Sequence, residues 1–518
     1  MVYLFLAWFI ACALHLVEAA TPDKNAILTQ LKKNGACCTA LAYFLPNQTH
    51  FNDILDTGYS NSQLSFWSAQ EQSLKPTCIV IPTSAQDVST AVTILYVAYQ
   101  ASIAGCKYAV RGAGHTPHAG AANINGGVTI DMQSMNQVTV AATKKSVSVG
   151  PGNRWGAVYP TLDDMDLTMV GGRLSPVGVG GLLTGGGISF FSGRYGFACD
   201  NIQQYELVLG NGTITTASSN TNPSLFRALK GGNNNFGIVT RFDAKVYPQS
   251  SFWGGIITQP MTNKEAVFDF FVKFSQSANY DPFSALITNF AWIAGSSLTS
   301  LIVLDVEYTN GSVTWPPPAF APLDAMLKVA TTVRKDKLSS FTTEIGSTNI
   351  ATSGHNNFFS TLTFINKPDV APEFLREAFK LVDATANSLT TVVGLIYTFT
   401  LQPLPYVLYS KASTSNALGL DRFKDDLANI LFTLSWTLPT DNDRVYSAIQ
   451  KLQGDIIALA KEKGIYNEWL YLNYASQFQD PIKAYGSASV AFLKSVSKQY
   501  DPAGVFQKAV PGGFKLGL

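Results

Sequence analysis

The chain is 518 residues long, with 36 basic and 35 acidic residues, and hydrophobic residues make up 46% of it. A chain of this length exceeds one ordinary hydrophobic core, so we expect two or three domains. Charged residues are only 14% of the total. This sparse and balanced charge excludes a surface built to attract nucleic acid or anionic membranes.

Residues 1–20, MVYLFLAWFIACALHLVEAA, form an apolar run that ends in small residues. The pattern predicts a secretory signal peptide that is cleaved near Ala19 or Ala20. A membrane anchor is the alternative, but the span is short, His15 interrupts it and no basic cluster follows. We therefore expect a secreted, extracellular protein without stable membrane association. Sequons at Asn47, Asn211 and Asn310 predict N-glycosylation.

Five cysteines follow the leader, namely Cys37, Cys38, Cys78, Cys106 and Cys199. Their spacing does not match a zinc site. In an oxidising compartment the first four predict one or two disulfides, in pairings that the sequence leaves open. Cys199 is then left over, and we interpret it as a buried thiol.

Residues 76–155 alternate strands and helices. The segment CIVIP predicts a buried strand, and Ser84 predicts the N-cap of a helix that leads to the strand KYAVR. Short strands follow in GGVTIDM, QVTVAA and SVSVGPG, and the dipeptide at 211–212 predicts a hairpin turn.

The pattern changes near residues 246–254. SALITNFAWIA and LTSLIVLDVEY predict two strands that meet across residues 295–297. A helix over 372–388 and strands in TVVGLIYTFTLQ and NILFTLSWTL follow, which indicates a sheet covered by helices. A further helix is predicted over 441–463, with Asp441 as its cap.

Three glycine-rich segments, 111–127, 170–189 and 229–240, suggest loops whose backbone N–H groups surround a bound anion. They match neither a P-loop nor a dinucleotide fingerprint, and no hydrolase elbow or zinc-protease motif occurs. His115 and His118 form an H-x-x-H pair, but no carboxylate is close in sequence. We therefore expect no metal.

Several motifs together resemble the secreted berberine bridge enzyme-like FAD-linked oxidases. They are AVRGAGH, SPVGVGGLLTGGG, SGRYGFACDNI, LKGGNNNFGIVT, YLNYASQFQDPIKAYG and KQYDPAGVF. This family has the fold of vanillyl-alcohol oxidase and p-cresol methylhydroxylase (PCMH). The resemblance implies an α+β protein with a two-part FAD-binding domain, residues 21–250 and 466–518. An inserted α+β substrate domain, residues 251–465, is expected to be built on an antiparallel sheet.

The resemblance assigns the flavin site. In this family the histidine of the R-x-x-G-H loop is bonded covalently to FAD through a ring nitrogen, and here that histidine is His115. A neutral imidazole is a good nucleophile, which suits this role. The other residues expected to hold the cofactor are Arg111, Gly112, Ala113, Gly114, Thr116, Gly178, Gly180, Gly181, Thr184, Gly185, Ile238, Val239 and Asn473.

Two departures from the family pattern modify this expectation. Many members carry a second flavin link from a cysteine ahead of the V-G-x-G-G run, but here Leu174 and Ser175 stand in that neighbourhood. A single covalent link is therefore expected. A histidine that often follows the paired glycines is replaced by Leu182, so no flavin hydrogen bond is expected from that side chain.

Alcohol oxidation needs a base for the hydroxyl proton. Because histidine is scarce, the family motifs point to Tyr471 and Tyr195 as catalytic residues. A tyrosine acts as a base only where positive charge favours its phenolate, and the sequence does not identify that cation. Asn473 and Tyr474 are expected to support the flavin.

The first residue of the V-G-x-G-G run, Val177, is expected to act as an oxygen gate, because valine there is associated with oxidases in this family. In the middle domain Tyr397, Gln402 and Trp436 are candidates to face the flavin. We expect a monomeric oxidase that takes a hydride from a small-molecule alcohol or phenol, a secondary metabolite being favoured, and passes the electrons to dioxygen. A carbohydrate oxidase and a non-catalytic flavin-binding protein are the alternatives.

Overall fold

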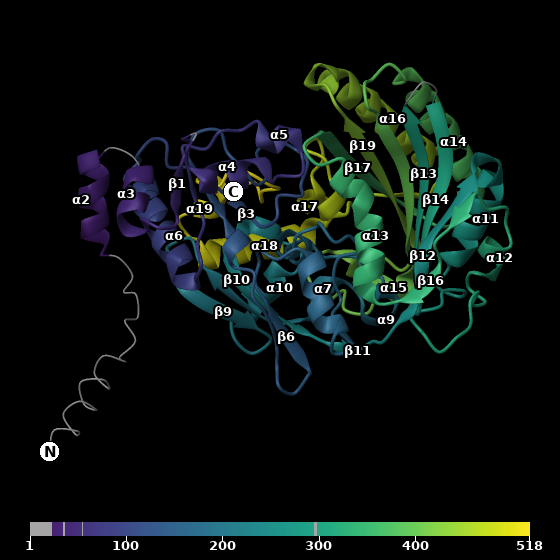
Figure 1. Ribbon diagram of the computed structural model, residues 1–518, viewed down its shortest axis with the longest axis horizontal. Helices are drawn as coiled ribbons and strands as arrows, with labels where there is room; N and C mark the ends of the chain where they lie inside the picture. Colours follow the sequence, from purple (N-terminus) through teal and green to yellow (C-terminus); the bar gives the residue numbers. More distant parts are fainter. Residues whose placement is uncertain (1–22, 35–36, 54, 295–297) are drawn as a thin grey trace.

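The computed structural model describes residues 23–34, 37–53, 55–294 and 298–518. The predicted signal peptide over residues 1–20 lies outside these ranges. The described chain has two parts, a mixed region of small sheets and a large antiparallel sheet covered by helices (Figure 1). The expected α+β class with an antiparallel substrate sheet is confirmed.

Three small sheets form the first part within the described residues, and the smallest pairs β7 (Leu167–Thr168) with β11 (Tyr247–Pro248). A four-stranded sheet has the order β1 (Thr49–Phe51), β2 (Cys78–Val80), β4 (Val128–Asp131) and β3 (Tyr108–Arg111). A five-stranded antiparallel sheet has the order β5 (Val138–Val140), β6 (Ser146–Val149), β10 (Ile238–Lys245), β8 (Ile202–Val208) and β9 (Ile214–Ser218). One glycine-rich loop therefore begins at the end of β3, and another leads into the start of β10. Both of these strands are largely buried.

Local signals explain several boundaries in this part. Ser84 caps α6 (Ala85–Gln100), because its hydroxyl accepts a hydrogen bond from the N–H of Asp87 at 3.1 Å. The hairpin between β8 and β9 turns at Gly212, whose φ of +86° is accessible to glycine at little cost. Both predictions are confirmed.

The second part is a nine-stranded sheet, counted within the described residues. It comprises β12 (Phe252–Pro260), β13 (Ser284–Ala294), β14 (Leu298–Tyr308), β15 (Ala330–Thr331), β16 (Arg334–Asp336), β17 (Asn356–Ile365), β18 (Ile396–Leu404), β19 (Leu427–Trp436) and β20 (Tyr466–Asn467). The long hairpin β13–β14 pairs Ser284 with Tyr308, as its two apolar runs predict. The predicted turn at 295–297 lies outside the described residues.

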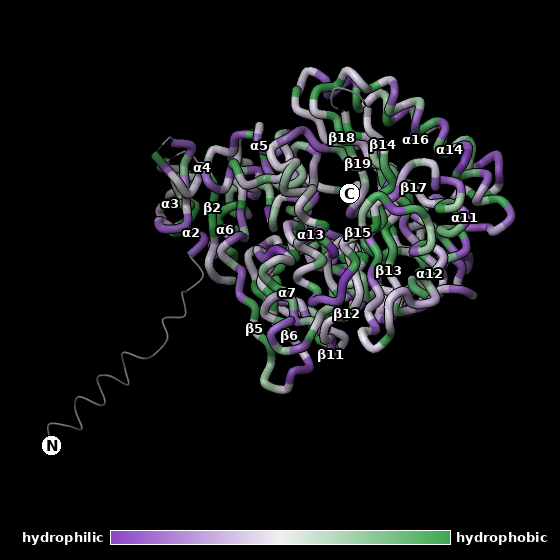
Figure 2. The backbone as a smooth tube through the Cα atoms, turned by 45° about the vertical axis from the view of Figure 1, so that its right-hand side comes forward, coloured by the Kyte–Doolittle hydropathy of each residue, from purple (hydrophilic) through white to green (hydrophobic). Residues whose placement is uncertain are grey.

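Three helices cover one face of this sheet, α11 (Lys264–Phe274), α14 (Ala371–Ser388) and α16 (Asn442–Glu462) (Figure 1). In Figure 2 strands such as β13 and β14 are largely hydrophobic, whereas α14 and α16 alternate between hydrophobic and hydrophilic residues. The apolar face of α14 is buried through residues such as Phe374 and Phe379. The opposite face of the sheet is thereby left to contact the first part of the chain.

One predicted cap differs from the structure. Asp441 does occupy the N-cap position of α16, but its side chain makes no capping hydrogen bond. The reason is a short 3-10 turn, Pro439–Asp441, that runs directly into the helix and gives Asp441 a helical backbone (φ −88°, ψ −5°). The side chain of a capping residue needs an extended backbone to reach the first free N–H groups.

The C-terminal segment returns to the first part. The N–H of Tyr108 in β3 donates to the carbonyl of Ala509 at 2.9 Å. Phe506, in α19 (Val505–Lys508), is packed in the core beneath the four-stranded sheet. The last residues of the chain therefore help to build the region around the glycine-rich loops.

Disulfides join Cys37 to Cys106 and Cys38 to Cys78, and Cys199 is a buried free thiol. The expected bonds among the first four cysteines are confirmed, and the structure supplies their pairing. Of the sequon asparagines, Asn47 and Asn211 are exposed and Asn310 is half-buried. None of the helices in the described part of the chain combines the length and apolarity that crossing a bilayer requires.

Candidate active site

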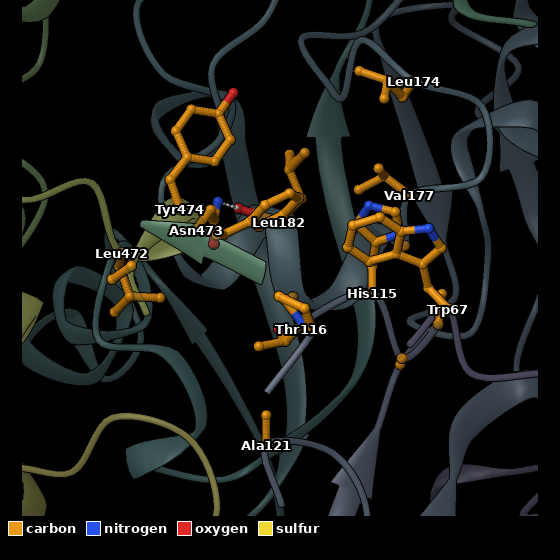
Figure 3. A pocket seen from close by; sticks show the side chains of 18 of the residues that line it. Trp67, His115, Thr116, Ala121, Leu174, Val177, Leu182, Leu472, Asn473 and Tyr474 are labelled. Atoms are coloured by element: carbon orange, nitrogen blue, oxygen red, sulfur yellow. Dashed lines mark hydrogen bonds between the residues drawn. The ribbon is translucent and has the colours of Figure 1, made fainter. Parts of the chain in front are cut away.

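A cavity of about 550 Å³ lies between the large sheet and the glycine-rich loops. One wall is made by the loop after β3 and by residues 173–188. The other wall is made by β13, β14, β18 and β19, and residues 471–475 close one side. Figure 3 shows part of this lining, with His115, Val177 and Tyr474 among the labelled residues. The three glycine-rich segments thus meet at one place.

His115 is positioned by the backbone on one side and by an aromatic ring on the other. Gly114 has a φ of +67°, and a Cβ atom there would lie 2.5 Å from the ring of Phe66, so glycine is required. The indole of Trp67 stacks on the imidazole, with ring centroids 4.4 Å apart and an interplanar angle of 12° (Figure 3). The ring of His115 is therefore held in one orientation at the cavity.

The environment of His115 keeps its imidazole neutral. Burial, assisted by the positive charge of Arg154, lowers the pKa of His115 to about 3. Its Nδ1 atom is buried and has no hydrogen-bond partner among the described residues. A neutral imidazole can supply the nitrogen nucleophile that a covalent bond to FAD requires, so His115 suits the predicted linkage.

The helix α5 (Ala69–Gln72) fixes the loop that follows His115. The hydroxyl of Ser68 donates to the carbonyl of Pro117 at 2.7 Å. The carboxylate of Glu71 accepts from the N–H groups of Gly120 at 3.2 Å and Ala122 at 2.6 Å. Burial raises the pKa of Glu71 to about 7, although these hydrogen bonds oppose the change. A buried acid therefore clamps the histidine loop.

Arg154 ties the histidine loop to the loop that carries Val177. Its guanidinium donates to the carbonyl of Ala113 at 3.0 Å and to the carbonyl of Pro176 at 2.5 Å. Val177 lines the cavity close to His115 (Figure 3). The two loops are therefore held as one unit, with the predicted gate residue fixed beside the predicted linkage residue.

Most residues predicted to bind the cofactor line this cavity. They are Gly112, Ala113, Gly114, His115, Thr116, Gly178, Gly180, Gly181, Thr184, Ile238, Val239 and Asn473. No described atom lies within 4 Å of a Cβ built on Gly181, so its backbone is open to a ligand. This arrangement is suited to a flavin held by main-chain groups.

Arg111 and Gly185 differ from that expectation, because neither lines the cavity. The guanidinium of Arg111 is buried in an ion pair with Asp131 at 3.1 Å and covers the ring of Phe66. Gly185 instead makes room for Asn473, whose Oδ1 would lie 2.0 Å from a Cβ at that position. Both residues support the cavity walls from behind.

Tyr195 and Tyr471 were predicted as a proton-handling pair, and the structure does not bring both to the cavity. Tyr195 is absent from its lining and stacks on Tyr247, with ring centroids 3.8 Å apart. Tyr471 reaches the cavity, but its hydroxyl oxygen accepts from the N–H groups of Gly187 and Ile188, both at 3.0 Å. Burial also raises the pKa of Tyr471. This hydroxyl is thus engaged in holding the backbone.

A second tyrosine of the same motif has different partners. The hydroxyl oxygen of Tyr474 accepts from Nη2 of Arg173 at 2.6 Å and from Nε2 of Gln402 at 3.0 Å. Arg173 also donates to Oε1 of Gln402 at 2.7 Å. All three residues line the cavity. The oxygen of Tyr474 is thus held at the cavity wall by a buried guanidinium and an amide.

The large sheet adds a polar group at the cavity wall. Asp305 on β14 is 4% exposed, and its Oδ2 accepts from Nδ2 of Asn289 on β13 at 3.0 Å. Thr400 on β18 donates to Oδ1 of Asn289 at 2.8 Å and fixes that amide. Burial raises the pKa of Asp305 to about 7, while Asn289 and the charge of Arg173 lower it.

Of the three middle-domain candidates, only Gln402 lines the cavity. Tyr397 stacks on Trp292, and Trp436 donates to Asn442 at the start of α16, so both lie in the core on the other face of the sheet. Alternate residues of a strand point to opposite faces, and the sequence does not tell which face is which. Here the polar residues of β18 identify the cavity face.

The departures from the family motifs also appear at the cavity. Leu174 lines it where a second flavin link would be expected, and it offers no thiol. The side chain of Leu182 lines it as well, and its carbonyl accepts from Nδ2 of Asn473 at 3.2 Å (Figure 3). That backbone contact keeps the loop in place without a histidine.

Sequence reasoning missed Trp67, Arg173 and Asp305 as cavity residues. It also missed Arg154, which holds two of the cavity loops together without lining the cavity itself. Arg173 lies in the glycine-rich segment 170–189, directly after Gly171 and Gly172, and a lone arginine among apolar residues was the available signal. Trp67 and Asp305 come from segments without a motif. Only the three-dimensional arrangement places them beside the histidine loop and the tyrosine.

Comparisons with known proteins agree with this site. A family model described as FAD binding domain matches residues 76–218. The FAD-dependent monooxygenase tpcD of Cochliobolus heterostrophus is 35% identical over 97% of this chain and 98% of its own length.

Two solved structures share the fold. Berberine bridge enzyme from Eschscholzia californica has a TM-score of 0.71 at 15% identity, covering 95% of this chain and 100% of its own. The xylooligosaccharide oxidase of Myceliophthora thermophila has a TM-score of 0.70 at 19% identity, covering 95% and 99%. The chain therefore belongs to the family of FAD-binding oxidoreductases that includes the fungal FAD-dependent monooxygenases, and it has the fold of berberine bridge enzyme.

Proposed function

We propose that the protein is a secreted oxidase that carries FAD on a single covalent bond to His115. The observation that supports the bond is the neutral, buried imidazole whose Nδ1 has no partner among the described residues. When bound, FAD would accept a hydride from the substrate and return the electrons to dioxygen, giving hydrogen peroxide. Leu174 supplies no thiol for a second link.

Tyr474 is the proposed proton acceptor, in preference to Tyr471 and Tyr195. As the C–H bond of an alcohol breaks with its electron pair, the O–H proton must leave the same substrate. The phenolate of Tyr474 takes this proton, and Arg173 and Gln402 hold its oxygen toward the cavity. Tyr471 serves this arrangement by packing against Tyr474, with ring centroids 4.7 Å apart.

The proposed substrate is an alcohol or phenol of moderate size with an apolar body. The walls near Tyr474 include Ile287, Ala291, Ile345, Phe359 and Leu431, and these surfaces suit a flat apolar ring system. The same cavity also presents polar side chains such as Thr398, Thr433 and Ser435, so an oligosaccharide is kept as the alternative substrate class.

Secretion is proposed from the leader over residues 1–20 and from the disulfide-bonded cysteines. Disulfides persist in oxidising compartments and are rare in the cytosol. Exposed sequons at Asn47 and Asn211 agree with this route. The protein is proposed to act as a monomer on small molecules.

The test is an oxygen-consumption screen of the purified protein against panels of phenols, alcohols and oligosaccharides, with peroxide measured in parallel. We expect peroxide with a phenol or alcohol, in a one-to-one ratio with oxygen consumed. Because relatives are named monooxygenases, products are also analysed after reaction under ¹⁸O₂. Labelled product without peroxide would contradict the oxidase proposal, and turnover only with oligosaccharides would contradict the substrate class. No flavin reduction by any panel would indicate a non-catalytic flavin-binding protein.

A further inference from the structure

Arg173 is a buried, charged residue that has more hydrogen-bond donors than the described residues accept from. It is 7% exposed, and no carboxylate of the described residues lies within the 4.0 Å of an ion pair. Its hydrogen bonds, to Gln402 and Tyr474, both come from Nη2. A guanidinium has five N–H donors, so the donors on Nη1 and Nε remain without protein acceptors in the described chain. Such a group in a cavity wall calls for an acceptor from a ligand.

Asp305 is the complementary group on the facing wall. Its Oδ2 is occupied by Asn289, whereas Oδ1 accepts no hydrogen bond from a described residue. Asn289 cannot turn away, because Thr400 and the carbonyl of Val303 hold both ends of its amide. The carboxyl is therefore fixed in place with one oxygen available. Arg173 is near enough to influence the pKa of Asp305, yet the two side chains do not pair.

An arginine and an aspartate that line one cavity without touching leave room for a group that both donates and accepts. A hydroxyl has this character, since its oxygen accepts from a guanidinium while its proton goes to a carboxylate. An anion would satisfy Arg173 but would be repelled by an ionised Asp305. An ether or a ketone would accept from Arg173 and leave Oδ1 of Asp305 unmatched.

We propose that Arg173 and Asp305 together bind a second, non-reacting hydroxyl group of the substrate and so select dihydroxy compounds with an apolar ring body. This inference deepens the proposed function, on which it rests for the position of Tyr474. The hydroxyl accepts from the free edge of Arg173 and donates to Oδ1 of Asp305. Asp305 is thus a specificity-determining residue. Gln402 and Nη2 of Arg173 keep their hydrogen bonds to the oxygen of Tyr474 when the substrate binds.

Ligand binding tests the proposal without requiring turnover. The flavin-loaded protein is titrated anaerobically by calorimetry with 2-naphthol, with its methyl ether 2-methoxynaphthalene, and with 2-naphthoate. We expect 2-naphthol to bind at least about tenfold more tightly than the ether, the effect of a hydrogen bond to a charged group. In Asp305→Asn this preference should fall below about threefold, because an amide is a weaker acceptor. Asp383→Asn, on α14 at the other face of the sheet, should retain it.

Several outcomes would overturn the proposal. Equal affinity, or no binding, of 2-naphthol and its ether in the unaltered protein would show that the hydroxyl is not recognised. If 2-naphthoate binds more tightly than 2-naphthol, and Asp305→Asn strengthens it further, Arg173 forms an anion site instead. Circular dichroism confirms that each variant is folded. If one of these results is found but a phenol or alcohol still reduces the flavin, the hydroxyl-binding inference is wrong and the proposed oxidase function is retained.

Discussion

At the scale of single residues, burial decides which groups can react. The same desolvation that lowers the pKa of His115 to about 3 raises the pKa of Tyr471. His115 thereby stays a neutral nucleophile, while Tyr471 stays protonated and holds the backbone at Gly187. Tyr474 differs because a guanidinium contacts its oxygen. Two tyrosines three residues apart in one motif therefore serve different purposes.

Replacing Tyr474 by phenylalanine removes the proposed proton acceptor. We expect anaerobic flavin reduction by a substrate to slow by ~100-fold or more, the effect of losing a general base. Stopped-flow absorbance of the flavin measures this rate. In Tyr471→Phe two backbone N–H groups lose their acceptor, so we expect a loss of stability of about 1–3 kcal/mol for each group and a smaller change in rate. If flavin reduction is slowed in Tyr471→Phe and unchanged in Tyr474→Phe, the proton acceptor is Tyr471.

Val177 is expected to control access of dioxygen. One added methylene in a close-packed wall can close a path for a molecule of that size. Val177→Ile should leave anaerobic reduction by substrate nearly unchanged and should slow reoxidation by dioxygen at least about tenfold. Mixing the reduced protein with oxygenated buffer measures the second rate. Equal reoxidation in both proteins would place the gate elsewhere.

At the scale of elements, short segments far apart in sequence fix the reactive loop. The helix α5 holds the loop after His115 through Ser68 and Glu71, and Arg154 joins that loop to Pro176. None of these holding residues belongs to the glycine-rich motifs. Glycine makes the loop conformation possible, and the neighbouring elements select it.

The clamp by Glu71 predicts a pH-dependent stability. Its pKa is about 7 in the folded protein and ~4.3 in an unfolded chain, so the folded state retains the proton more strongly. The free energy of unfolding should therefore fall as pH rises from ~4.3 to about 7, by on the order of 3 kcal/mol from this group. Urea unfolding at several pH values should show a flatter profile in Glu71→Gln. The exposed Glu373→Gln should keep the original profile, and a steep profile in Glu71→Gln would contradict the account.

At the scale of the whole molecule, the two disulfides join the helix α3 (Cys37–Phe44) to strand β2 and to the segment that leads into β3. The bond between Cys37 and Cys106 spans 69 residues, and that between Cys38 and Cys78 spans 40. Loop-closure entropy predicts a stabilisation of about 4 kcal/mol from each bond. Chemical unfolding should show that loss when either pair is replaced by alanine. Cys199→Ala breaks no bond and should change stability much less; equal losses in all three variants would refute the assignment.

Secretion makes a separate prediction at this scale. Expressed in a eukaryotic host, the mature chain should begin near Ala20 or Thr21 and should lose mass on treatment with an N-glycosidase. Mass spectrometry of the secreted protein measures both. An active form recovered uncleaved from the cytosol would rule out this route.

The sequence predicts the parts of the fold that have local causes. The hairpin β13–β14, the cap at Ser84 and the turn at Gly212 each follow from nearby residues. The flavin loops follow from motifs. On the sheet wall of the cavity, Asp305 was not predicted, and Gln402 could not be told apart from Tyr397 and Trp436. The face to which each of these residues points depends on strand register and on the packing of two distant parts of the chain.

The proposed function rests on a covalent bond between His115 and FAD in the cavity. Acid precipitation followed by peptide mapping tests for this bond. We expect the precipitate to stay yellow and the peptide that contains GAGHTPHAG to carry the flavin mass, with fragmentation placing it on His115. His115→Ala should release its flavin on precipitation, whereas His118→Ala should retain it. Flavin that leaves the unaltered protein in acid, or that stays covalently bound in His115→Ala, would contradict the claim.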